Sequence, residues 1–91
     1  MEDVGALATM SLLKTVALQG NRISDLSPLS GLHALESVLL ADNEITDLSA
    51  LVENEGLGAQ DLIDVRQNPL SSDALSVQIP ALEARGVLVD R

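Results

Sequence analysis

The chain has 91 residues, 14 of them acidic and 5 basic, and a net charge of -9. A charge of this sign repels nucleic-acid phosphates and anionic lipids, so we expect neither as a partner. The chain has no cysteine, which excludes disulfides, thiolate metal sites and cysteine nucleophiles, and no aromatic residue, so aliphatic side chains must fill the core.

The first twelve residues predict a partial repeat, because their apolar residues recur 22 residues later. Met1, Val4, Leu7 and Met10 correspond in this way to Ile23, Leu26, Leu29 and Leu32. The apolar run here is too short to span a membrane, and it follows two acidic residues where a secretory signal begins with positive charge. We therefore predict no membrane insertion. The compartment stays open: cytoplasmic, or extracellular if the chain is a fragment of a longer exported protein.

Full repeats are predicted to start near residues 13, 35 and 60. The stretch LQGNRISDLSPL, residues 18–29, returns 22 residues later as LADNEITDLSAL. The third copy, IDVRQNPL, comes three residues late, and the extra residues fall in the glycine-containing segment 52–60. A regular period of this length is typical of a solenoid, in which each coil covers the apolar edge of the next. We interpret residues 1–91 as one solenoid domain.

Each repeat contains a short stretch with alternating side chains, at residues 15–19, 37–41 and 62–66. A period of two indicates β-strands, so Val16, Val38 and Ile63 should point inward and stack in a parallel sheet. A last strand is expected at residues 87–89, with Val89 aligned on Val65.

An asparagine follows each of the three strands, at positions 21, 43 and 68. Its amide has two donors and an acceptor, so it can satisfy backbone groups that a turn leaves unpaired inside the coil. Asn21, Asn43 and Asn68 are therefore predicted to form a structural ladder rather than a ligand site.

The return path of each coil is predicted to be a short helical or 3₁₀ turn. Gly5, Ser27 and Ser49 are the expected N-caps, because these residue types are acceptable there and Ala6, Pro28 and Ala50 follow at the first helical position, where proline is tolerated. A column of aspartates, Asp3, Asp25 and Asp47, lies just ahead. A row of carboxylates can bind calcium, but aspartate before a turn more often accepts hydrogen bonds from the backbone, which is the interpretation we favour.

A longer helical segment is predicted at residues 72–85. Ser72 is the expected cap, Leu75, Ile79 and Leu82 form the expected buried stripe, and Gly86 is expected to end the helix. Pro80 removes one helical hydrogen bond, which predicts a kink or two short helices.

The frame L-x-x-L-x-L-x-x-N-x-I, filled from Leu13 and again from Leu35, resembles the leucine-rich repeat family in its 22-residue, internalin-like bacterial class. The resemblance implies an α/β fold: a right-handed solenoid with short parallel strands on its concave face and short helical or 3₁₀ turns on its convex side. It also implies a non-catalytic protein-interaction module that uses the concave face.

Outward-facing strand residues give the candidate binding surface. The predicted partner-binding residues of the concave face are Thr15, Ala17, Gln19, Ser37, Leu39, Ala41, Leu62, Asp64, Arg66 and Leu88. Three of them are leucines, where a solvated strand normally carries polar side chains, and the frame places Leu88 beside Asp64. Apolar anchors with a polar rim are typical of a protein-binding surface. The sequence does not identify the partner.

Other functions receive less support from the sequence. His33, the single histidine, has no recognisable nucleophile or base in register with it, so we predict no catalysis and no cofactor. The alternative function is a structural spacer or assembly segment of a longer repeat protein, with end-to-end self-association through an open N-terminal edge. A calcium-stabilised surface protein is the third interpretation.

Overall fold

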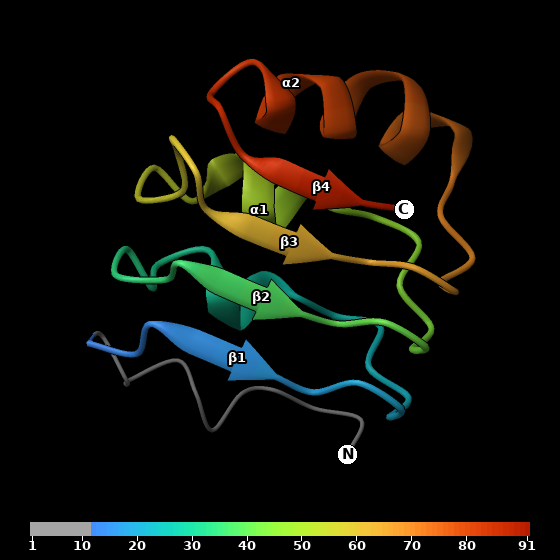
Figure 1. The fold of residues 1–91 in the computed structure, drawn as a ribbon. Coiled ribbons are helices and arrows are strands. Elements are labelled where there is room, and N and C mark those ends of the chain that lie inside the picture. The colour runs from blue at the N-terminus through green and yellow to red at the C-terminus, as the bar shows by residue number, and fades with distance from the viewer. Residues whose placement is uncertain (1–11) are drawn as a thin grey trace.

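The computed structural model describes residues 12–91, and the parallel sheet predicted from the repeats is confirmed. The strands are β1 (Thr15–Ala17), β2 (Ser37–Leu39), β3 (Leu62–Asp64) and β4 (Leu88–Asp90), in the order β1-β2-β3-β4. All three pairings are parallel, and one strand comes from each coil (Figure 1). Val16 pairs with Val38, and Val38 with Ile63, as the alignment of the repeats requires.

The coils are paired over a greater length than the three-residue strands indicate, because backbone hydrogen bonds between neighbouring coils continue beyond the carboxyl ends of the strands. Leu18 N–H donates to Leu39 O at 2.9 Å, and Gly20 N–H donates to Ala41 O at 3.1 Å. The next pair of coils repeats this arrangement, since Asp42 N–H donates to Arg66 O at 2.9 Å. The residues that follow the strands are therefore held in the same register as the strands themselves.

The predicted register of the last strand was wrong by two residues. The strand is Leu88–Asp90 rather than 87–89, and Val89 pairs with Ile63 instead of Val65. Leu88 consequently lies beside Leu62, and Asp90 lies beside Asp64. A shift of two residues leaves every side chain on the same face, so the alternation that identifies a strand does not reveal it.

Helical turns of different length close the coils on one side of the sheet (Figure 1). They are the 3₁₀ turn η2 (Ser27–Leu29), the helix α1 (Ser49–Glu53), the π-helical turn η3 (Ala74–Gln78) and the helix α2 (Ile79–Glu83). The opposite face of the sheet is the concave face. No helix within residues 12–91 has the length and hydropathy that crossing a membrane requires.

The C-terminal helical segment differs from the prediction in its start and its buried face. Ser71 rather than Ser72 caps it, since the Ser71 Oγ accepts a hydrogen bond from Ala74 N–H at 3.1 Å. The segment consists of the π-helical turn η3 followed by the helix α2, in which Pro80 is the second residue, so two short helical elements replace one regular helix, which is one of the two predicted outcomes. The extra residue per turn rotates the apolar stripe, so Ala74, Ile79 and Leu82 are buried while Leu75 is 49% exposed.

Gly86 ends this segment, as predicted. Its φ is +90°, and Val87 N–H donates back to Leu82 O while Gly86 N–H donates to Glu83 O. These two bonds are the usual pair at a glycine-terminated helix. They turn the chain sharply into β4.

The core is a stack of aliphatic layers between the sheet and the helical turns. The side chains that are fully buried include one layer from Ile23, Leu29 and Leu32 and the next from Ile45, Leu48 and Leu51. Burying one such side chain contributes about 1.5–3 kcal/mol. Because aromatic residues are absent, each layer has nearly the same thickness, which allows the coils to stack in register.

Candidate functional site

The concave face brings the predicted residues together in three columns that run across the strands. The pairings place Thr15, Ser37, Leu62 and Leu88 in the first column and Ala17, Leu39, Asp64 and Asp90 in the second. The hydrogen bonds beyond the strands place Gln19, Ala41 and Arg66 in the third. The leucines are thus grouped on β2, β3 and β4, whereas β1 contributes only small or polar side chains.

The three leucines of the concave face, Leu39, Leu62 and Leu88, form what we call the leucine patch. Leu62 and Leu88 are direct neighbours in the register, and Leu39 lies diagonally across from Leu62 on the adjacent strand. Leu88 is 58% exposed, while Leu39 and Leu62 are half-buried. The corrected register of β4 brings Leu88 closer to Leu62 than the sequence predicted, which makes the patch more continuous.

Asp64 and Arg66 form a bidentate ion pair beside the leucine patch, which we call the Asp64–Arg66 fork. The Arg66 guanidinium donates from Nε to Asp64 Oδ1 and from Nη2 to Oδ2, each at 2.9 Å, and Arg66 N–H also donates to Oδ1 at 3.2 Å. Asp64 is buried, with only 7% of its surface exposed, and Arg66 lies over it toward solvent. The Arg66 hydrogen bonds lower the pKa of Asp64, so the pair stays charged and rigid near neutral pH.

A hollow of about 200 Å³ opens next to this fork, lined by Ala41, Arg66 and Gln67. It lies beyond the carboxyl ends of β2 and β3, where the chain turns toward the asparagines. It adds a recess to one border of the otherwise shallow sheet surface.

The asparagines connect neighbouring coils through hydrogen bonds. Asn43 donates from Nδ2 to Leu40 O at 2.9 Å in its own coil and to Leu18 O at 3.0 Å in the preceding one, and its Oδ1 accepts from Ile23 N–H at 3.1 Å. Asn68 makes the same contacts one coil later, to Val65 O and Leu40 O. Asn21 donates to Leu18 O at 2.8 Å. These amides are engaged with the backbone along the corner of the solenoid.

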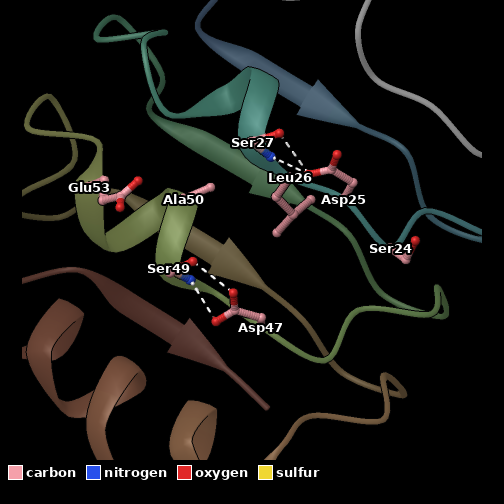
Figure 2. A pocket seen from close by; sticks show the side chains of 8 residues that line it. All are labelled: Ser24, Asp25, Leu26, Ser27, Asp47, Ser49, Ala50 and Glu53. Carbon is pink, nitrogen blue, oxygen red and sulfur yellow. Dashed lines mark hydrogen bonds between the residues drawn. The ribbon is translucent and has the colours of Figure 1, made fainter.

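The aspartate column caps the helical turns, and the predicted serine caps were wrong. Ser27 and Ser49 are the first residues of η2 and α1, and their backbone N–H groups donate to Asp25 Oδ1 and Asp47 Oδ1 (Figure 2). Both serine hydroxyls donate to the same carboxylates, at 2.7 Å. The aspartate two residues earlier reaches the turn better than the serine, whose own backbone is already helical. Gly5 and Asp3 lie outside the described residues.

These contacts also set the protonation of the two carboxyl groups. The pKa of Asp25 is lowered by the Ser27 backbone and hydroxyl donors, and the pKa of Asp47 is lowered first by the Gln78 side chain and then by Ser49. A hollow of about 110 Å³ lies between the two turns, with Glu53 at its border (Figure 2). Within residues 12–91, no three His, Cys, Asp or Glu side chains gather in a way that could hold a metal ion.

Three polar side chains outside the repeat frame were not predicted. Asn54 is fully buried and donates to Leu29 O at 2.8 Å and Leu32 O at 3.0 Å, joining α1 to the preceding coil. Gln78 accepts from Leu48 N–H and donates to Asp47, and Arg85 donates to the backbone carbonyls of Val52 and Asn54. All three link the last coil or the inserted loop to earlier coils. Gln78 has a signal in the sequence, because it is a polar residue between Val77 and Ile79, whereas Asn54 lies between two glutamates and has none. His33 is exposed.

Comparison with known proteins supports the repeat assignment. The family model of leucine-rich repeats in two copies matches residues 11–53. The fold is similar to the crystal structure of internalin C2 from Listeria monocytogenes, with a TM-score of 0.70 and 23% sequence identity. The similarity covers 97% of this chain and 36% of that one, so the chain spans little more than a third of the length of that protein. No curated protein sequence matches the chain.

The repeat frame and the single parallel sheet with one strand per coil agree with these comparisons. Leucine-rich repeats generally mediate protein–protein interaction and are typically non-enzymatic. The chain has an internalin-like leucine-rich-repeat fold, and its residues 11–53 match the family model of leucine-rich repeats.

Proposed function

We propose that this chain is a non-catalytic module that binds a partner protein through its concave sheet, with the leucine patch as the centre of the contact. The observation that carries the proposal is the grouping of Leu39, Leu62 and Leu88 on three neighbouring strands. The opposite faces of β2 and β3 are filled by Val38 and Ile63, which are completely buried, and that of β4 by Val89, which is half-buried against the core. The leucines therefore add nothing to the core, and covering them with a partner removes apolar surface from water.

The surroundings of the leucine patch suit a protein contact. Apolar anchors bordered by satisfied polar groups are the usual anatomy of such an interface. The Asp64–Arg66 fork is already paired, so covering it does not leave a buried carboxylate without a partner. The rigid backbone register means that the surface needs little rearrangement to bind, which reduces the entropic cost of association.

The non-catalytic part of the proposal rests on the chemistry of the same face. Its one carboxylate–guanidinium pair has a lowered pKa on the acid and a raised pKa on the base, which is the opposite of what general acid or base catalysis near neutral pH needs. His33 lies away from this face, ahead of β2, in the turn that follows η2.

The experiment is capture of partner proteins on the immobilised chain, followed by comparison of variants. Leu39→Asp and Leu62→Asp should abolish capture of any partner that binds the concave face. Leu75→Asp, which alters an exposed leucine on η3, is the matched control and should leave capture unchanged. Equal capture by the parent and by both concave-face variants would contradict the proposal that the leucine patch is the centre of the contact.

A second candidate function is a spacer or assembly segment of a longer repeat protein. The observation that favours it is the 36% coverage of internalin C2, which shows that the same fold occurs within a longer chain. Light scattering over a range of concentrations tests the self-association part of this candidate: a monomer at high concentration argues against it. The N-terminal edge on which the prediction depended involves residues 1–11 and lies outside the described residues.

A further inference from the structure

Carboxylates border the leucine patch at the amino ends of its strands. Glu36 directly precedes β2 and Asp61 directly precedes β3. Their backbone carbonyls accept hydrogen bonds from the neighbouring strands, Glu36 O from Leu62 N–H and Asp61 O from Leu88 N–H, each at 2.8 Å. The backbone of both acids is therefore fixed next to Leu62 and Leu88. The Asp61 carboxylate accepts a hydrogen bond from Gly58 N–H at 2.9 Å in the loop ahead of β3, and Glu36 is exposed. Lys14, the base in the same row, precedes β1, where the face has no leucine.

A second group of charges borders the patch at the carboxyl ends of the strands. Asp64 and Asp90 are register neighbours on β3 and β4. One guanidinium, that of Arg66, forms the fork with Asp64 and also interacts electrostatically with Asp90. Two carboxylates against one guanidinium leave a formal charge of -1 on this border. Both borders of the patch are thus negative, in a chain whose net charge is -9.

We propose that the segment of the partner that docks on the leucine patch is cationic and amphipathic, with aliphatic side chains on the leucines and Lys or Arg side chains toward Glu36 and Asp90. This inference rests on the proposed function and specifies the chemistry of the partner. Complementary charge speeds encounter and rejects like-charged competitors. The same argument excludes a second copy of the chain on this face, because two acidic surfaces repel each other.

The dimensions of the patch fit a segment about one helix wide. Neighbouring strands lie about 5 Å apart, so the leucines on β2, β3 and β4 span about 10 Å across the sheet. A helix with its side chains is about 10–12 Å in diameter. One apolar helix face can therefore cover all three leucines while its flanking positions reach the carboxylates on both borders.

The experiment uses two synthetic helical peptides as probes, each of about 18 residues, or five turns. They have the same leucine positions at i, i+3, i+4 and i+7, with lysine at the flanking positions of one and glutamate at those of the other. Binding to the full chain is measured by fluorescence anisotropy at low and high salt. The expected result is binding of the lysine peptide that weakens with salt, and at least tenfold weaker binding of the glutamate peptide, about 1.4 kcal/mol.

Variants separate docking on the patch from general attraction to an acidic protein. Leu88→Asp and Leu62→Asp add negative charge, so a purely electrostatic contact would tighten. Docking on the leucines predicts instead that the affinity for the lysine peptide falls about tenfold, roughly the effect of losing one apolar anchor. Leu75→Asp adds the same charge on η3 and should change the affinity less than about twofold. Circular dichroism of each variant verifies the fold, and the exposed Leu88 makes its substitution safe for folding.

The possible outcomes distinguish this inference from the proposed function. If the glutamate peptide binds as well as the lysine peptide, and Leu88→Asp weakens both, the concave face binds but the cationic chemistry is wrong. If the lysine peptide binds the Leu88→Asp and Leu62→Asp variants as tightly as the parent, the leucine patch is not its site and the inference fails. If neither peptide binds the parent, the inference fails while partner capture by the parent still decides the proposed function.

Discussion

The side chain of Asn68 holds the backbone of Asn43: the Asn68 Oδ1 accepts a hydrogen bond from Asn43 N–H at 3.1 Å, and the same oxygen accepts from Ile45 N–H at 3.1 Å. One amide thus fixes two residues of the preceding coil. Asn43 does the equivalent for Ile23 one coil earlier. Because these bonds fix the rise from coil to coil, they also fix the spacing of the strands on which the leucine patch lies.

We predict that Asn43→Ala lowers the free energy of unfolding by about 3 kcal/mol. The substitution leaves the buried N–H of Ile23 without its acceptor, which costs about 1–3 kcal/mol. It also removes one hydrogen bond from each of the carbonyls of Leu18 and Leu40, at about 0.5–1.5 kcal/mol each, although these carbonyls keep the donors of Asn21 and Asn68. Asn21→Ala is the control, since Asn21 is only partly buried, and it should cost about 1 kcal/mol. Urea unfolding measures both, and equal losses would contradict the cooperative role of the central amide.

Gly20→Ala should destabilise the fold, whereas Gly31→Ala should not. An added Cβ meets nothing within 4 Å at either position, but Gly20 has a φ of +74° and Gly31 does not lie in that region. A left-handed alanine costs about 1–2 kcal/mol, partly offset by the lower entropy of the unfolded chain, so we expect a net loss of about 1 kcal/mol. Thermal unfolding of the two variants is the measurement. A loss at Gly31 as large as at Gly20 would show that backbone conformation is not the cause.

Asp42 and Gln67 occupy the position of Gly20 in the next two coils, with φ of +60° and +61°. The repeat pattern therefore specified that the chain turns here but not which residues carry left-handed conformations. Glycine is a recognisable signal for that region, aspartate is a weaker signal, and glutamine is none.

Arg66→Met should lower the free energy of unfolding more than Arg91→Met does, because it leaves the buried Asp64 carboxylate without its charged donor. Solvent moderates this loss because the Arg66 side chain itself is 61% exposed. Arg91→Met removes the ion pair with Glu83, in which both side chains are well exposed, and should cost at most about 0.5 kcal/mol. Chemical denaturation compares the two, and an equal cost would mean that burial of Asp64 is not decisive.

Acid should destabilise the parent more steeply than the Asp47→Asn variant. The pKa of Asp47 is lowered in the folded chain by Gln78 and Ser49, so the folded form holds its proton less tightly than the unfolded form. The resulting stabilisation is complete above the ordinary value of 3.8 and is lost as the pH falls through the lower folded pKa. Unfolding midpoints recorded between about pH 5 and pH 2.5 should therefore fall less in the variant. Gln78→Ala, which removes the largest cause of the shift, should give an intermediate slope, and three identical slopes would contradict this account.

The parallel stacking of Val16, Val38 and Ile63 could be predicted because the period of the repeat requires it. The place of β4 could not, since a longer helical segment returns the chain to the sheet and a two-residue shift preserves the alternation that defines a strand. The buried face of the C-terminal helical segment could not be predicted from the sequence pattern either. The π-helical turn η3 changes the spacing of the stripe, and the sequence signals it only through Pro80.

Polar contacts were predicted where they repeat and missed where they do not. The asparagines recur in every coil, so their position indicates their role. Asn54 occurs once, in the inserted loop, and Gly56 beside it allows the loop to pass against the backbone of His33, where a Cβ would come within 2.1 Å of the His33 carbonyl oxygen. The Asp64–Arg66 fork likewise depends on side-chain directions that two residues of spacing do not specify.

The central claim, that the leucine patch is the binding surface, is tested most directly by methyl NMR of the leucine-labelled chain during titration with the lysine peptide or with a captured partner. The account predicts that the methyl signals of Leu39, Leu62 and Leu88 shift together and saturate at one ligand per chain, while those of the exposed Leu75 stay in place. Shifts at Leu75 with none at the three concave leucines would contradict it.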